Sequence, residues 1–273
     1  MLSVRELLPV ALQAVSEAAP LVRERPAGAR IAKGERDYAY ELDVRVERGL
    51  REFLHERTPS IPVLGEEEGR SGGAADRLLW TVDPVDGTVN YGRGLPLCGI
   101  ALGLALDRRP VLGVIDMPFL GARYQAVEGG GAEVSGRPLR CRAATRLEEA
   151  VVAVGDFAVA SGGARSLRNR RYLALLERLS ARALRIRMLG SAALDLAWLA
   201  EGRLDASVTL ANNPWDMCAG VAIAREAGAV VADLDGSDYS LEAAVTLAAP
   251  PSLFEELRTM VGEAVRVADA SPA

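Results

Sequence analysis

Residues 83–91 read DPVDGTVNY and come directly after a predicted strand at 78–82. Pro84 fixes its own φ angle and biases Asp83 towards an extended conformation. Asp83 and Asp86 can then converge from the two sides of a tight turn. Because the turn ends an ordered strand, the positions of both carboxylates are well defined. We therefore expect this stretch to carry the chemistry of the protein.

The backbone of the same turn adds further polar groups. The carbonyl of Val85 can point towards the two aspartates, and Gly87 lets the backbone approach a ligand closely. If a helical turn begins near Thr88, the free N–H groups of Gly87 and Thr88 form an anion site. One short segment would thus offer oxygen ligands for a metal and hydrogen-bond donors for a phosphate.

Two other acidic motifs lie at the ends of predicted elements. GEEEG at 65–69 follows a short predicted strand, and NPWD at 213–216 opens a predicted helix. Oxygen ligands without histidine or cysteine suit Mg²⁺ rather than zinc. Taken singly, the motifs have ordinary structural interpretations, namely a turn, a solvated glutamate run and a helix N-cap at Asp216. Their combination is far more specific.

The composition excludes several classes of protein. The 273 residues are 49% hydrophobic and 25% charged, which is typical of a globular chain, and the net charge of -5 argues against a nucleic-acid polymer as partner. The three cysteines, Cys98, Cys141 and Cys218, form no disulfide or zinc pattern and favour a cytoplasmic location. A single histidine, His55, leaves little for a Ser-His-Asp or multi-histidine site. We expect no signal peptide and no membrane span.

Hydrophobic periodicity predicts mixed helices and strands. Helices are expected at 3–24, about 38–55, 167–181, 192–200, 215–227 and 252–267. Strands are expected at 61–64, 78–82, 98–106, 111–117, 122–127, 131–135, 151–154, 204–208 and 245–248, with a loop at 70–76. This order favours a layered α/β or α+β fold over a barrel. We expect one unit over residues 1–273, with closely packed halves at about 1–145 and 146–273.

The three acidic motifs resemble those of the inositol monophosphatase family, in the superfamily of lithium-sensitive, metal-dependent sugar phosphatases. The family patterns are Gly-Glu-Glu, Asp-Pro-Ile/Leu-Asp-Gly-Thr-x-Asn-Phe/Tyr and Trp-Asp-x-Ala-Gly. The last reads WDMCAG at 215–220, one residue out of phase at Ala. The resemblance spans roughly residues 30–235. It implies an αβαβα sandwich, a homodimer, and a Mg²⁺-dependent phosphoric monoester hydrolase acting on a small phosphorylated metabolite.

The resemblance also implies roles for individual residues, with two or three Mg²⁺ ions per site. The first ion would be held by Glu66, Asp83 and the Val85 carbonyl, and the second by Asp83, Asp86 and Asp216. Glu67 would lie in the outer shell or bind a third ion. Phosphate and substrate would contact Gly87, Thr88, Ser191, Ala192 and Asp216, with Asp195 in support. Catalysis would involve Thr88, Asp43 and Glu66, with Asp43 drawing the Thr88 proton while an activated water attacks phosphorus in line and no phospho-enzyme forms.

Two positions depart from the family pattern. Many members that act on inositol carry a glutamate where this chain has Thr209, so inositol itself is not indicated. The segment Asp-x-x-Thr-x-x-Asp reads Asp37 to Asp43 here, with Tyr40 in place of threonine.

Alternative substrates are histidinol phosphate, a nucleotide, fructose 1,6-bisphosphate, or an aminocyclitol or nucleoside intermediate. A non-catalytic metal-binding regulator is the alternative from another class.

Overall fold

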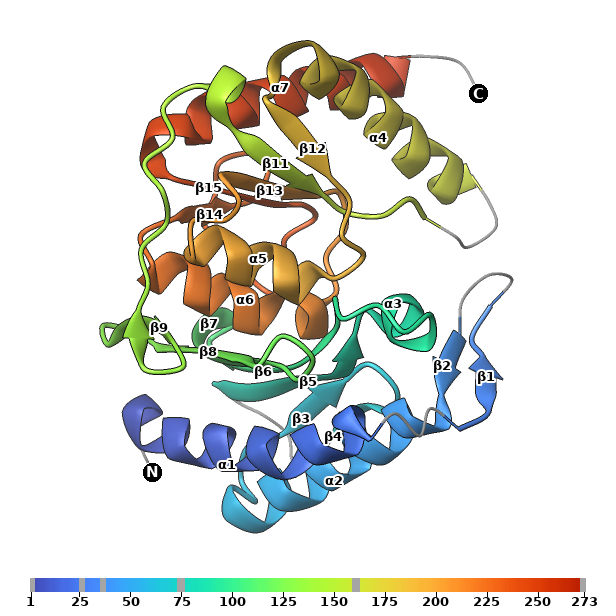
Figure 1. Cartoon of the computed structure of the whole chain (residues 1–273), viewed down its shortest axis with the longest axis vertical. Coiled ribbons are helices and arrows are strands. Elements are labelled where there is room, and N and C mark those ends of the chain that lie inside the picture. The colour runs from blue at the N-terminus through green and yellow to red at the C-terminus, as the bar shows by residue number, and fades with distance from the viewer. Residues whose placement is uncertain (1–2, 25–27, 35–37, 73–76, 159–162, 271–273) are drawn as a thin grey trace.

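The computed structural model describes residues 3–24, 28–34, 38–72, 77–158 and 163–270, with the side chains of 163–166 excepted. Helices and sheets alternate in five layers (Figure 1). An eight-stranded sheet and a five-stranded sheet enclose a central pair of helices, and two further helices cover the outer face of each sheet. The expected layered fold, an αβαβα sandwich, is confirmed.

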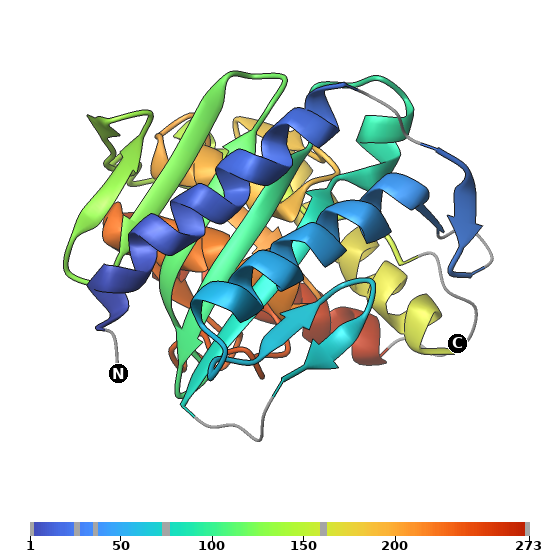
Figure 2. The same ribbon diagram turned by 90° about the horizontal axis from the view of Figure 1, so that it is seen from below.

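The first outer layer consists of α1 (Val4–Arg23) and α2 (Glu41–Arg57), which lie side by side across the eight-stranded sheet (Figures 1 and 2). The sheet has the order β10-β9-β8-β7-β6-β5-β3-β4. Its strands are β3 (Val63–Gly65), β4 (Gly69–Ser71), β5 (Leu78–Asp86), β6 (Gly99–Leu106), β7 (Arg109–Met117), β8 (Ala122–Val127), β9 (Gly131–Val134) and β10 (Arg137–Pro138). All neighbours pair antiparallel except β3 and β5, which are parallel.

The central layer consists of α5 (Ala192–Ala200) and α6 (Pro214–Glu226), and the outer layer on the far side of α4 (Gly163–Arg182) and α7 (Pro251–Ala270). Between them lies the second sheet, with the order β12-β11-β13-β15-β14. Its strands are β11 (Val151–Val154), β12 (Arg185–Arg187), β13 (Ala206–Thr209), β14 (Val230–Ala232) and β15 (Thr246–Ala249). A small hairpin, β1 (Arg30–Ala32) and β2 (Tyr38–Tyr40), a short helix α3 (Thr88–Gly92) and a 3₁₀ turn (Leu147–Glu149) complete the described elements.

Small residues let α6 lie very close to the first sheet. A Cβ atom on Gly113 of β7 would lie only 2.2 Å from the backbone oxygen of Ala219 on α6. On β6, a Cβ atom on Gly103 would lie 2.7 Å from Cys218 Sγ. Residues Met217 to Ala224 are all buried, as expected for a helix enclosed by two sheets. This close packing brings the start of α6, and with it Asp216, towards the end of β5.

Several predicted segments differ from the structure. The helix expected from residue 38 begins at Glu41, because Tyr40 is extended and its backbone N–H donates to the Asp43 carboxylate at 3.1 Å. The loop expected at 70–76 is in part strand β4, and 73–76 lie outside the described residues. The strands expected at 61–64 and 204–208 are β3 and β13, and both lie further towards the C-terminus than expected. Strands β12 and β14 were not predicted, since each has only three residues.

Candidate metal and phosphate site

The last residues of β5 form an irregular turn that carries two aspartates. The register with β6 shifts between Asp83 and Asp86, and Asp83 Oδ1 accepts a hydrogen bond of 3.0 Å from the N–H of Val85. Gly87 follows with φ of 87°, a left-handed conformation that favours glycine. A Cβ atom there would also lie 2.8 Å from the carbonyl oxygen of Leu97. The chain can therefore turn at once into α3.

Asp86 joins the end of β5 to the start of α5. Its carboxylate accepts hydrogen bonds from the Ser191 hydroxyl and from the N–H groups of Ala192 at 3.3 Å and Ala193 at 2.9 Å. Burial raises the pKa of Asp86 to about 6, although the bonds from Ser191 and Ala193 act in the opposite direction. The structure thus brings Asp86 together with Ser191 and Ala192, which follow it by more than a hundred residues in the sequence.

Thr88 lies between a carboxylate and a backbone carbonyl. Its Oγ1 is 3.1 Å from Asp43 Oδ1 and 3.1 Å from the carbonyl oxygen of Val85. Burial raises the pKa of Asp43 to about 6, against the hydrogen bonds from Tyr40 and Thr88. Tyr40 points elsewhere and packs edge-on against Tyr91, with ring centroids 6.3 Å apart. Asp37, the other predicted aspartate of this segment, lies outside the described residues.

The acidic turn after β3 is paired with a lysine that the sequence analysis missed. Lys33 Nζ lies 2.8 Å from Glu66 Oε1 and 2.6 Å from Glu67 Oε1. Burial alone would lower the pKa of Lys33, but the two glutamates outweigh it and the pKa lies above its ordinary value. Burial raises the pKa of Glu67 to about 7 in spite of this ion pair. Lys33 has no sequence signal beyond its place in a short polar hairpin.

A buried ion pair on α2 supports the same turn and was also missed. Glu47 accepts hydrogen bonds from the N–H groups of Glu67 at 2.8 Å and Glu68 at 2.9 Å, and from Arg51 Nε at 2.8 Å. Arg51 in turn donates to Ser71 Oγ at 2.6 Å and to the carbonyl of Gly69. Glu47 is completely buried. The pair therefore fixes the backbone that presents Glu66 and Glu67.

The carboxylates of the site act on one another. Burial raises the pKa of Asp83 well above its ordinary value, and the charges of Glu66, Asp86, Asp216 and Asp43 raise it further. The pKa of Asp216 is raised in the same way, first by burial and then by Asp86 and Glu66. Asp216 accepts one hydrogen bond, 3.0 Å from Asn213 Nδ2. Lys33, which pairs with Glu66, is a single positive charge against these several acidic groups.

This donor set fits Mg²⁺. All its side chains are carboxylates, and hard cations prefer oxygen ligands. Across the described residues, no three acidic, histidine or cysteine side chains already stand around one point as they would around an ion. Two of the carboxylates have protein partners instead, since Glu66 pairs with Lys33 and Asp86 accepts from Ser191. Helix α6, which carries Asp216, nevertheless packs against β5, which carries Asp83 and Asp86.

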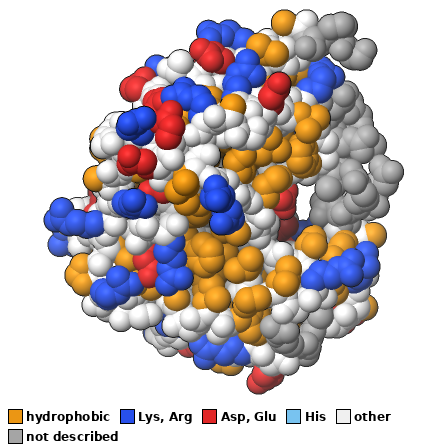
Figure 3. Space-filling model, turned by 45° about the horizontal axis from the view of Figure 1, so that its top comes forward, with side chains coloured by type: hydrophobic (Ala, Val, Ile, Leu, Met, Phe, Trp, Pro, Cys, Tyr) orange, Lys and Arg blue, Asp and Glu red, His pale blue; other side chains and the backbone are white. Residues whose placement is uncertain are grey.

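A cavity of about 210 Å³ opens beside these carboxylates. Asp86, Ser191, Ala192 and Asp216 are among the residues that line it. Thr209, at the position where the family pattern has glutamate, lines it as well. Figure 3 shows acidic side chains at the margin of a hollow, with hydrophobic side chains beside it.

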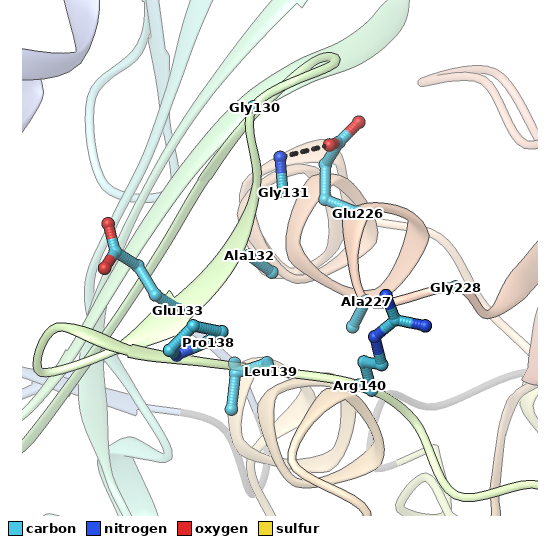
Figure 4. Close-up of a pocket in the computed structure, with 10 residues that line it drawn as sticks. All are labelled: Gly130, Gly131, Ala132, Glu133, Pro138, Leu139, Arg140, Glu226, Ala227 and Gly228. Carbon is cyan, nitrogen blue, oxygen red and sulfur yellow. Dashed lines mark hydrogen bonds between the residues drawn. The ribbon is translucent and has the colours of Figure 1, made fainter.

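A larger groove, about 520 Å³, lies elsewhere, between β9 and the C-terminal end of α6 (Figure 4). In it, Glu226 accepts hydrogen bonds from the N–H groups of Gly129 at 3.0 Å and Gly131 at 2.8 Å. None of the predicted site residues lines this groove. Although this groove is larger than the cavity beside the carboxylates, its lining residues do not make it the candidate site.

Most of the chain matches known proteins. The model of the inositol monophosphatase family matches residues 3–266. The chain belongs to the inositol monophosphatase family. The probable inositol 1-monophosphatase ImpA of Mycobacterium tuberculosis is 40% identical over 237 residues, 86% of either chain. The fructose-1,6-bisphosphatase/inositol-1-monophosphatase of Thermotoga maritima is 33% identical over 232 residues, 85% of either chain.

Solved structures of the family agree in fold. The IMPase of Thermotoga maritima has a TM-score of 0.86 and 29% identity, and the match covers 96% of this chain and 99% of that one. The extragenic suppressor protein SuhB of Bartonella henselae has a TM-score of 0.85 and 30% identity, covering 94% and 98%. This inositol monophosphatase family member is therefore a phosphoric monoester hydrolase, as expected, and acts on a phosphorylated small molecule. None of the described helices is both long and apolar enough to cross a membrane.

Proposed function

We propose that this protein is a Mg²⁺-dependent phosphomonoesterase that hydrolyses a small phosphorylated sugar, cyclitol or related alcohol. The observation that carries the proposal is the meeting of Asp83 and Asp86 at the end of β5 with Asp216 at the start of α6. Asp86 and Asp216 raise the pKa of Asp83, Asp86 also raises the pKa of Asp216, and Asp86 and Asp216 line a cavity of about 210 Å³. Relatives named for inositol phosphate support the substrate class.

The residues of the site would bind the metal ions, the phosphate and the substrate as follows. Glu66, Asp83 and the Val85 carbonyl would hold one ion, and Asp83, Asp86 and Asp216 a second, with Glu67 further out or on a third. When bound, the ions would neutralise the phosphate and make a water more acidic. The N–H groups of Gly87 and Thr88 would bind phosphate oxygens. Ser191 and Ala192 would border the substrate while holding Asp86 in place.

Metal dependence is the first test. We expect phosphate release from at least one ester when Mg²⁺ is present, and loss of release when EDTA replaces it. The panel comprises inositol phosphates, histidinol phosphate, fructose 1,6-bisphosphate, nucleotides and aminocyclitol phosphates. If calorimetry shows Mg²⁺ binding but no ester is hydrolysed, the protein is a metal-binding regulator instead.

Thr88 gives a second test, because its hydroxyl lies within hydrogen-bond distance of Asp43. The change Thr88→Val keeps the shape of the side chain and removes the proton path. We expect the turnover number at saturating Mg²⁺ to fall about a hundredfold or more. Thr88→Ser keeps the hydroxyl and serves as the matched control. A Thr88→Val rate within about threefold of wild type would exclude proton transfer through Thr88.

We further propose a homodimer in the cytoplasm, with the halves at about 1–145 and 146–273 working as one unit. Cys98, Cys141 and Cys218 are free, which suits a reducing compartment. The bonds from Ser191 and Ala193 to Asp86 link the two halves at the site. Exposed hydrophobic side chains, such as Val89, offer contact surface for a second copy. Sedimentation of the purified protein measures the oligomeric state.

A further inference from the structure

The cavity beside the site contains two carboxylates that the proposed metal ligands do not include. Asp156 follows strand β11, and Asp195 lies on α5. Both line the cavity of about 210 Å³ that is also lined by Asp86 and Asp216. A substrate whose phosphate is bound at the metal ligands would place its alcohol part in this cavity.

Asp195 is buried, and one of its carboxylate oxygens lacks a hydrogen-bond donor in the part of the chain that the structure describes. Its exposed fraction is 2%, and Oδ1 has no hydrogen-bond donor among the described residues. Burial raises its pKa well above the ordinary value, and the charges of Asp86 and Asp156 add to the shift. A buried carboxyl group without a donor is unfavourable. A ligand that brings a cationic donor into the cavity would remove this cost.

Asp156 places a second carboxylate near the position where the family pattern has glutamate. The N–H of Gly155 donates to the carbonyl oxygen of Val208 at 2.9 Å, so β11 ends beside β13. A Cβ atom on Gly155 would lie 3.2 Å from Cγ2 of Thr209. Asp156 is exposed, and within the described ranges it makes no ion pair. The cavity is therefore lined by threonine at position 209 and by the carboxylate of Asp156, which follows the neighbouring strand β11.

The charge of the residues that line this cavity favours a cationic ligand. One basic side chain, Arg168, appears among its described lining residues, against Asp156 and Asp195. Two carboxylates and one guanidinium leave an excess of negative charge even when Asp86 and Asp216 are counted only as metal ligands. An ammonium group has three donors and no acceptor, which matches acceptor-only carboxylates.

We propose that the alcohol part of the substrate carries a basic nitrogen, bound as an ammonium group by Asp156 and Asp195. The proposal rests on the proposed function, because it requires the phosphate to be held at Asp83, Asp86 and Asp216. It narrows the substrate class to phosphate monoesters of amino alcohols, including amino sugars and aminocyclitols. Arg168 then balances part of the charge in the same cavity.

The test uses matched pairs of esters that differ only in an amino or hydroxyl group. The pairs are glucosamine 6-phosphate with glucose 6-phosphate, and 3-aminopropyl phosphate with 3-hydroxypropyl phosphate. We expect wild-type kcat/KM to favour the amine by about tenfold to a hundredfold in at least one pair. In Asp156→Asn and in Asp195→Asn this ratio should fall towards one.

Asp156→Asn keeps the test informative if Asp195→Asn does not fold, since Asp156 is exposed. Glu263→Gln, which removes an exposed carboxylate on α7, is the matched control and should keep the wild-type ratio. If both hydroxyl esters are hydrolysed as well as their amines, the ammonium subsite is wrong while the phosphatase proposal stands. If none of the four esters nor any other monoester is hydrolysed, the proposed function itself fails.

Discussion

Replacing Asp86 by asparagine is expected to lower Mg²⁺-dependent phosphate release about a thousandfold or more, since a metal ion contributes several kcal/mol to such a reaction. Asp86 is nearly completely buried, and three donors at the start of α5 fix its carboxylate. Asparagine keeps the size of the side chain but removes the negative charge that a second ion requires. Phosphate release is measured at saturating Mg²⁺ with the best ester of the panel.

A binding measurement separates loss of metal from loss of fold. Mg²⁺ should raise the melting temperature of the wild type, because a ligand that binds only the folded state stabilises it. Asp86→Asn should fold and show a much smaller rise. Asp238→Asn, an exposed aspartate whose side chain is 81% accessible, is the matched control and should behave as wild type. A rate above about a tenth of wild type in Asp86→Asn would exclude Asp86 as a metal ligand.

The long amphipathic elements could be predicted from sequence because their periodicity is a property of the segment itself. In α2 the apolar residues Leu42, Val46 and Leu50, spaced four residues apart, are all buried. The start of the helix was placed too early, since Tyr40 is held extended by the side chain of Asp43, a contact that hydrophobic periodicity does not report. Short strands such as β12 and β14 were missed for a related reason. Three residues form a strand only because neighbouring strands pair with them.

The candidate site also contains residues that could be predicted from the local sequence and residues that could not. Asp83, Asp86 and Thr88 belong to one continuous motif, so their proximity could be predicted locally. The residues that contact the acidic turn with Glu66 and Glu67 could not be predicted in this way. Lys33 reaches Glu66 from a hairpin 33 residues away, and nothing in its neighbours marks it. Arg51 was overlooked because a Glu–Arg pair four residues apart on a helix normally lies at the surface. Only the tertiary structure shows that it is buried beneath the turn.

Breaking the Glu47–Arg51 pair is expected to destabilise the protein by about 3–5 kcal/mol, because the remaining charge is left buried and unpaired. Arg51→Met removes the donors to Ser71 and Gly69, and Glu47→Gln removes the charged acceptor of the Glu67 and Glu68 N–H groups. The free energy of unfolding is measured in urea. Arg48→Met is the control on the same helix. It breaks an exposed pair with Glu68, worth about 0–1 kcal/mol.

The double variant Glu47→Leu with Arg51→Met shows what the pair contributes besides stability. Without either charge, the desolvation cost disappears, so the double variant should lose less free energy than the two single variants together. The N–H groups of Glu67 and Glu68 still lose their acceptor, and the turn that carries Glu66 is no longer fixed. We therefore expect Mg²⁺ affinity, measured by calorimetry, to fall about tenfold to a hundredfold in the double variant, as for other groups that orient metal ligands. Wild-type affinity in a double variant of restored stability would show that Glu47 and Arg51 serve the fold alone.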